Sequence, residues 1–164
     1  MTLPQIPTRG WASYDIALKA VGEGRPGDLR ADLPFLRATG LVDPDDPAHL
    51  SQSGKAYFAA RFVRHDDATA TLVLREALLT LPTVAAVTQL LDGVPGADRG
   101  TVETVLRSEG YGEGLRDRDV GFMVSLLARA GIISYNKASG SVEVLLHPAR
   151  EQEPPPSVLI SPAT

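Results

Sequence analysis

The sequence predicts a mainly α-helical (α+β) fold with short β-hairpins, arranged as two small units in tandem. Apolar residues recur at spacings of three and four over much of the chain, which is typical of amphipathic helices. Around both Gly40 and Gly131, a helical pattern is followed by an apolar pair, a polar turn and a second apolar stretch. Because glycine readily ends a helix in the left-handed conformation, each repeat predicts a helix that leads into a hairpin.

Length and composition limit the kind of protein. The 164 residues suffice for one ordinary domain or two small ones. Aromatic residues are only 5% of the chain against 43% hydrophobic residues, so the core is expected to be mostly Leu, Val and Ala. The absence of cysteine excludes disulfides, thiolate metal sites and cysteine nucleophiles. No secretory leader or membrane-spanning apolar run is visible, so a cytoplasmic protein without a membrane partner is expected.

The chain divides into four expected parts. They are an extended N-terminal segment (1–9), a first unit (10–65), a second unit (68–147) and a disordered, Pro-rich tail (148–164). Five prolines and two acids make the tail unsuited to a packed element.

In the first unit, Ser13 is expected to cap the first helix and Ser51 a later one. Pro34 fits the first turn of a helix that ends at Gly40, because proline needs no hydrogen-bond partner there. The residues that follow predict the first hairpin: strand Leu41-Val42, turn 43–47 and returning strand His49-Leu50.

In the second unit, three helices precede the second hairpin. Asp98 is expected to cap the middle helix, and the third runs from Leu115 to Ala130. The apolar face of this third helix consists of Val120, Met123, Val124 and Leu127. The strands after Gly131 are predicted at 132–135 and 141–146, joined by the turn 136–140.

Two stretches of this sequence resemble bacterial winged helix-turn-helix domains. They read LRATGLVD…LSQSGKAYF and LRDRDVGFMVSLLARAGIISYNKASGSVEV. Three helices followed by a two-stranded wing is the order of such a domain, so the resemblance, over residues 28–146, implies two winged-helix units in tandem. The second half is similar to winged-helix segments of restriction and other phage-defence proteins. This implies a non-enzymatic DNA-binding protein, either a regulator or an accessory or specificity component of a bacterial defence system.

If the resemblance holds, the third helix of the second unit is the recognition helix, with double-stranded DNA as its partner. The expected DNA-binding residues are Arg116, Arg118, Ser125 and Arg129 on that helix and Lys137 at the wing tip. Arginine suits this role because its guanidinium can bond phosphates and guanine edges. However, Asp117 and Asp119 alternate with the arginines and would repel phosphates. An ordinary solvated helix face with internal ion pairs is the alternative.

No catalytic residue, metal ligand or cofactor site is expected. The acidic turn at Asp43 has Ala48 and Gly54 where a calcium-binding EF-hand loop needs Gly and Glu. The stretch 134–137 matches Ser-x-x-Lys only by letter, since it runs from a strand into a turn. The glycine-rich stretch 110–114 follows a helix and lacks the Gly-Lys-Ser/Thr ending of a phosphate-binding loop.

A second function stays open. The net charge of −4 is unlike that of most nucleic-acid-binding proteins. A tandem winged-helix scaffold that binds a protein partner or a second copy, and not DNA, would fit the acidic body. The apolar stretch Ser157–Ile160 within the tail adds to this second hypothesis.

Overall fold

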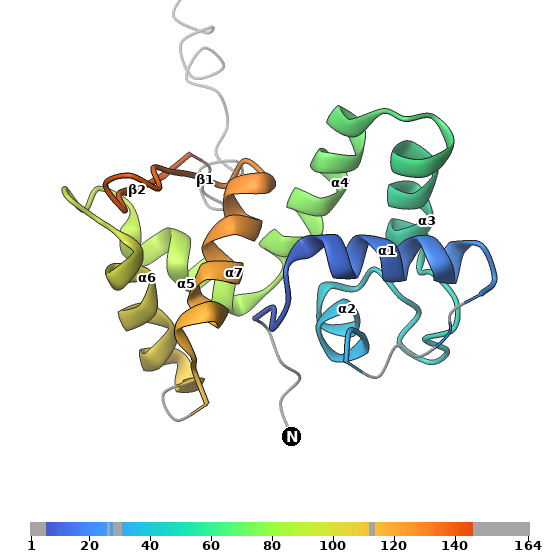
Figure 1. Cartoon of the computed structure of the whole chain (residues 1–164), viewed down its shortest axis with the longest axis horizontal. Helices are drawn as coiled ribbons and strands as arrows, with labels where there is room; N and C mark the ends of the chain where they lie inside the picture. Colours follow the sequence, from blue (N-terminus) through green and yellow to red (C-terminus); the bar gives the residue numbers. More distant parts are fainter. Residues whose placement is uncertain (1–5, 26, 28–30, 112–113, 146–164) are drawn as a thin grey trace, which may run out of the picture.

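The computed structural model describes residues 6–25, 27, 31–111 and 114–145. In these residues, seven helices precede one short antiparallel two-stranded sheet near the C-terminal end of the described chain (Figure 1). The mainly helical class is therefore confirmed. The elements are α1 (Trp11–Gly22), α2 (Leu33–Thr39), α3 (Gln52–Phe58), α4 (Asp67–Leu79), α5 (Pro82–Leu91), α6 (Arg99–Leu106), α7 (Asp117–Arg129), β1 (Ile133–Tyr135) and β2 (Val142–Val144). The wider turns η1 (Ala59–Val63) and η2 (Arg107–Tyr111) extend α3 and α6.

Helices α1 to α4 form one group, on the right in Figure 1. Helix α3 packs against both α1 and α4. Gly10, not Ser13, precedes the first turn of α1, so the expected cap is wrong. The hydroxyl of Ser13 instead donates to Oδ1 of Asp32 at 3.1 Å, which ties α1 to the residue before α2.

The first predicted hairpin is reduced to a single bridge between Val42 and Leu50. Gly40 does end α2 at φ 77°, and Ser51 does cap α3 through the Gly54 amide, as predicted. The ladder stops because the loop satisfies its amides locally: Oδ1 of Asp43 accepts the amides of Asp45 and Asp46, at 2.9 and 3.3 Å. Such side-chain-to-backbone bonds compete with strand pairing. The expectation of two hairpins is therefore corrected to one hairpin and one bridge in the described residues.

Helices α5 to α7 and the sheet form the second group, on the left in Figure 1. Asp98 caps α6 through the Thr101 amide, as predicted. Strand β1 pairs with β2 in the register Ile133 opposite Val144. On the other side of β2, Asp98 forms an isolated bridge with Ser141. Burial confirms the predicted apolar face of α7: Val120, Met123, Val124 and Leu127 are all inaccessible to solvent.

Helix α4 joins the two groups. It contacts α3 on one side and α5 on the other. From α4, Nε of Arg75 donates to the carbonyl oxygen of Ala130 at 2.8 Å, at the C-terminal end of α7. A Cβ at Gly131 would lie 2.7 Å from the Arg75 guanidinium, and the φ of Gly131 is +75°. The positive φ favours glycine at this position, and an added Cβ would also force the end of the Arg75 side chain to move.

Candidate nucleic-acid interface

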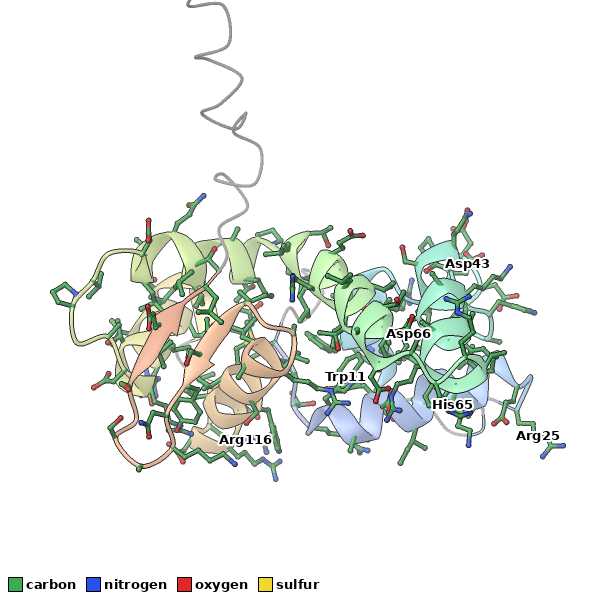
Figure 2. The ribbon with its side chains drawn as sticks, turned by 90° about the horizontal axis from the view of Figure 1, so that it is seen from above. Trp11, Arg25, Asp43, His65, Asp66 and Arg116 are labelled. Carbon is green, nitrogen blue, oxygen red and sulfur yellow. The ribbon has the colours of Figure 1, made fainter. Side chains whose placement is uncertain are left out.

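The structure places the five predicted DNA-binding residues on α7, just before it, and in the turn of the hairpin. All five are exposed: Arg116, Arg118, Ser125, Arg129 and Lys137. Ser125 follows Arg118 by seven positions and Arg129 follows it by eleven. At 100° per residue, these three side chains leave the helix within about 40° of one another around its axis. They form one stripe along α7, with about 16 Å between its two arginines along the axis. Arg116 lies just before α7, at the edge of the second group of helices (Figure 2).

The two aspartates that alternate with the arginines are each paired with an arginine, Asp117 at the surface and Asp119 in the interior. Nη1 of Arg99, in the first turn of α6, lies 2.6 Å from Oδ1 of Asp117. Asp119 is buried, and its Oδ2 accepts the backbone amide of Arg116 at 3.0 Å and lies 3.3 Å from Nε of the same residue. Both acids therefore have a cationic partner, and Asp119 is turned away from solvent.

The stripe retains two cations after this pairing. Within the described residues, Arg118 and Arg129 form no ion pair. Lys137, in the hairpin turn, forms none there either. Arg118 and Arg129 therefore place positive charge on the exposed face of α7, next to the exposed carboxylate of Asp117, in a protein whose net charge is −4.

The first group of helices approaches the C-terminal half of this stripe. The half-buried ring of Phe122 faces Gly10, where an added Cβ would lie 4.0 Å from Cε1. Arg129 lines a hollow of about 100 Å³ together with Tyr57, Arg61 and Asp67. The stripe is thus open chiefly at its N-terminal end, which narrows the predicted interface to Arg116, Arg118 and the hairpin turn.

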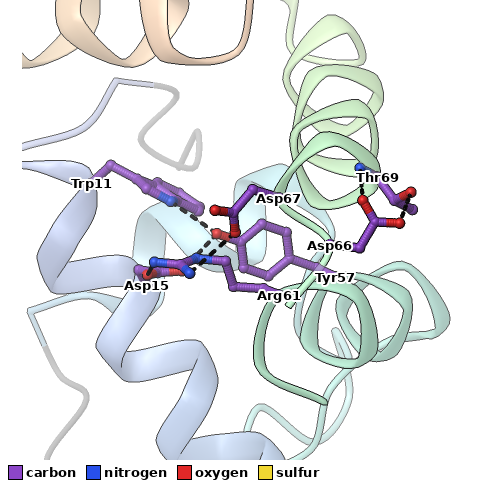
Figure 3. A network of polar contacts seen from close by, with 7 residues as sticks. All are labelled: Trp11, Asp15, Tyr57, Arg61, Asp66, Asp67 and Thr69. Carbon is purple, nitrogen blue, oxygen red and sulfur yellow. Dashed lines mark hydrogen bonds and ion pairs between the residues drawn. The ribbon is translucent and has the colours of Figure 1, made fainter. Parts of the chain in front are cut away.

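A buried polar network lies on the first group of helices, near Arg129 (Figure 3). The Tyr57 hydroxyl accepts from Nε1 of Trp11 at 3.2 Å and donates to Oδ1 of Asp15 at 2.6 Å. Nη2 of Arg61 lies 3.2 Å from Oδ2 of Asp15, and its Nη1 lies 3.3 Å from Oδ1 of Asp67. The network joins α1, α3, η1 and α4.

This network is structural in character. Burial raises the pKa of the Tyr57 phenol to about 12, and the hydrogen bond to Asp15 adds to the rise. The phenol therefore keeps its proton and acts as a donor, not as a base. Sequence analysis missed this cluster, although Asp15 stands in the apolar stripe of α1 with Trp11, Tyr14 and Leu18. An acid at a core-facing position of a helix is the signal that could have indicated it.

A larger hollow, of about 690 Å³, lies beside the hairpin. It is enclosed by loop 92–97, by Ser134 of β1 and by residues 141–144. Its acidic side chains are Asp92 and Glu143, and across the described residues no three His, Cys, Asp or Glu side chains are grouped so that they could hold a metal ion.

None of the described helices alone is long and apolar enough to cross a bilayer. Helices α4 and α5 would qualify together by length and composition, but they are bent by 91° at their junction. Comparison with known proteins gives no match, whether to protein-family models, to curated proteins or to solved structures.

Proposed function

We propose that this protein is a non-enzymatic, winged-helix DNA-binding protein that contacts duplex DNA through the N-terminal end of α7 and the hairpin turn. The protein would act as a regulator, or as an accessory or specificity component of a bacterial defence system, as the sequence resemblance implies.

The order of elements in the second group supports this proposal. Helices α5, α6 and α7 are followed by the hairpin, and the residue before α6 pairs with the hairpin through the Asp98–Ser141 bridge. In winged-helix proteins the helix before the wing enters the major groove and its N-terminal residues contact the bases. By this analogy, α7 is the recognition helix, and Arg116 and Arg118 stand at its reading end.

The observation that carries the proposal is the pairing of the acids on α7. Alternating Asp and Arg would give a helix face no attraction for phosphates. Arg99 is ion-paired with Asp117, whose carboxylate stays exposed, and Arg116 is ion-paired with the buried Asp119. Arg118 and Lys137 form no ion pair within the described residues and are the cations left to attract phosphates. Phosphate contacts by these groups would release counterions, which makes binding sensitive to salt.

The experiment is fluorescence anisotropy with a labelled random duplex, titrated between about 50 and 200 mM salt. Replacing Arg118 and Lys137 together by Ala should weaken binding to all sequences and lower the salt slope by about two contacts. The matched control replaces Lys55 and Arg64, two exposed cations of the first group, and should leave the slope unchanged. Wild-type protein that binds no duplex even at low salt would refute the proposal.

A specific observation favours the second candidate function, a protein-interaction scaffold. Near and after the hairpin, Val94 and Leu145 expose apolar side chains, and Leu90 does so at the end of α5. If the wild-type protein binds no DNA but co-purifies with a partner that protects these side chains, the scaffold function is the better one.

A further inference from the structure

A hollow of about 380 Å³ lies at the outer end of the first group of helices, where Asp43 is labelled in Figure 2. It is bordered by the C-terminal end of α1, by the loop between α2 and α3, and by α3 itself. Its volume falls within the range of about 300–1,000 Å³ that is typical of small-molecule sites. None of the five predicted DNA-binding residues borders it. The site consists of described residues only; the predicted disordered tail, 148–164, lies outside them.

The walls of this hollow are mostly apolar. Val21 and Leu50, both buried, line it together with the half-buried ring of Phe58. A Cβ at Gly22 would collide with that ring, so the glycine allows the ring to lie against the end of α1. Apolar surface predominates over polar surface in these walls. A bound apolar side chain would therefore cover surface that the protein leaves open to water, which is favourable.

Two opposite charges line the same hollow. Oδ1 of the half-buried Asp43 accepts the amides of Asp45 and Asp46, which holds the carboxylate in place, while its Oδ2 accepts no hydrogen bond from the described residues. Lys55 is exposed and forms no ion pair with any acid of the described chain. Nδ1 of His49, the remaining polar side chain, lies 2.7 Å from Oδ2 of Asp46. A carboxylate and an ammonium group therefore border one small site, each with bonding capacity left.

We propose that this hollow binds a free α-amino acid with an apolar side chain. The ammonium group of the ligand donates to Oδ2 of Asp43, its carboxylate accepts from Nζ of Lys55, and its side chain lies against Phe58. An α-amino acid carries both charges on groups bonded to one carbon atom, so it matches two opposite charges that border one hollow. The long, exposed side chain of Lys55 is flexible and can close on the ligand.

Charge complementarity selects this class of ligand over others. A simple carboxylate would pair with Lys55 but would be repelled by Asp43, and a simple amine would pair with Asp43 but would be repelled by Lys55. Either end of a peptide chain presents only one of the two charges. Amino-acid binding is measured without DNA, so its absence would leave the DNA-binding proposal untouched, and the reverse also holds.

Amide NMR spectra of the full-length protein, titrated with L-leucine, test the proposal. The amides of Gly22, Leu50 and Lys55 should shift with a Kd of about 1 mM or tighter. N-acetyl-leucine lacks the ammonium charge and leucine amide lacks the carboxylate. Each should bind at least about 10-fold more weakly, because each loses a hydrogen bond between charged groups. Glycine lacks the apolar side chain and should also bind at least about 10-fold more weakly.

Lys55→Gln and Asp43→Asn remove the two charges of the site one at a time. Each should weaken leucine binding about 10-fold or more. Asn at position 43 keeps a side-chain oxygen for the two loop amides, so the loop should keep its shape, and an unchanged Tm verifies this. The matched controls are Arg64→Gln and Asp45→Asn, at exposed residues outside the hollow, and they should leave the Kd unchanged.

Three outcomes would overturn the proposal. One is the absence of any amide shift with up to about 20 mM L-leucine or L-phenylalanine. Another is equal binding of leucine and N-acetyl-leucine, because a carboxylate alone would then be sufficient. The third is leucine binding that is unchanged in Lys55→Gln, which would place the ligand elsewhere on the protein. Shifts around the hollow that are lost with either charge of the ligand, and with either variant of the site, support the proposal.

Discussion

Replacing Tyr57 by Phe removes one oxygen atom from the centre of the buried network. The ring itself stays, and with it the edge-to-face contact with Trp11 at 6.0 Å between centroids. The variant therefore isolates the two hydrogen bonds of the hydroxyl, one from Trp11 and one to Asp15.

The structure gives the size of the effect. A hydrogen bond to a charged group contributes about 1.5–3 kcal/mol and one between neutral groups about 0.5–1.5 kcal/mol. Asp15 keeps Arg61 as a partner, but the buried Trp11 N–H would keep none among the described residues. We therefore expect a loss of about 2–4 kcal/mol in the free energy of unfolding. For a chain of this size that corresponds to a fall in Tm of about 4–16 °C.

Urea denaturation at neutral pH, followed by far-UV circular dichroism, measures this loss. The control is Tyr135→Phe, since Tyr135 is half-buried and its hydroxyl has no hydrogen bond within the described residues. It should change the free energy of unfolding by less than about 0.5 kcal/mol. If Tyr57→Phe is as stable as the wild type and as the control, the network does not hold α1 to α3 and the reasoning is wrong.

Three further predictions concern pH and packing. The pKa of Tyr57 is about 12 in the folded state against an ordinary 10.0, so the stability that this group contributes is complete below pH 10 and is lost as the pH rises to 12. The loss amounts to about 2–3 kcal/mol in the free energy of unfolding. It should be absent when the unfolding of Tyr57→Phe is measured over the same alkaline range. Gly131→Ala should lower the Tm more than Gly40→Ala, because both have positive φ but only Gly131 faces Arg75; equal shifts in calorimetry would contradict this. Leu127→Ala, at a fully buried side chain, should cost about 2–5 kcal/mol in urea denaturation.

Features set by local spacing could be predicted from the sequence. The apolar face of α7, the caps Ser51 and Asp98, and the strand pair after Gly131 each depend on residues only a few positions apart. Capping and helical periodicity act over one or two turns, so their signals stand in the sequence itself.

Features set by distant partners could not be predicted. Ser13 fails as a cap because its hydroxyl bonds Asp32, 19 residues further on. Leu90, which has the spacing of a core residue, is 55% exposed because Val84, Val87 and Leu91 already fill the face of α5 that meets the core. The Asp15–Tyr57 hydrogen bond joins residues 42 positions apart, so no local sequence pattern predicts it.

The charge on the candidate interface depends on the same kind of distant contact. From the sequence alone, Asp117 lies between Arg116 and Arg118 and would cancel one of them. In the structure, its carboxylate lies against Arg99, which comes from α6, 18 residues earlier. Asp119 differs, because it is buried and its partner Arg116 lies only three positions earlier in the chain. The charge near α7 therefore depends on the packing of α6 against α7 as well as on the order of charges along the helix. For that reason, an acidic protein with mixed charges along α7 can still present cationic side chains to phosphates there.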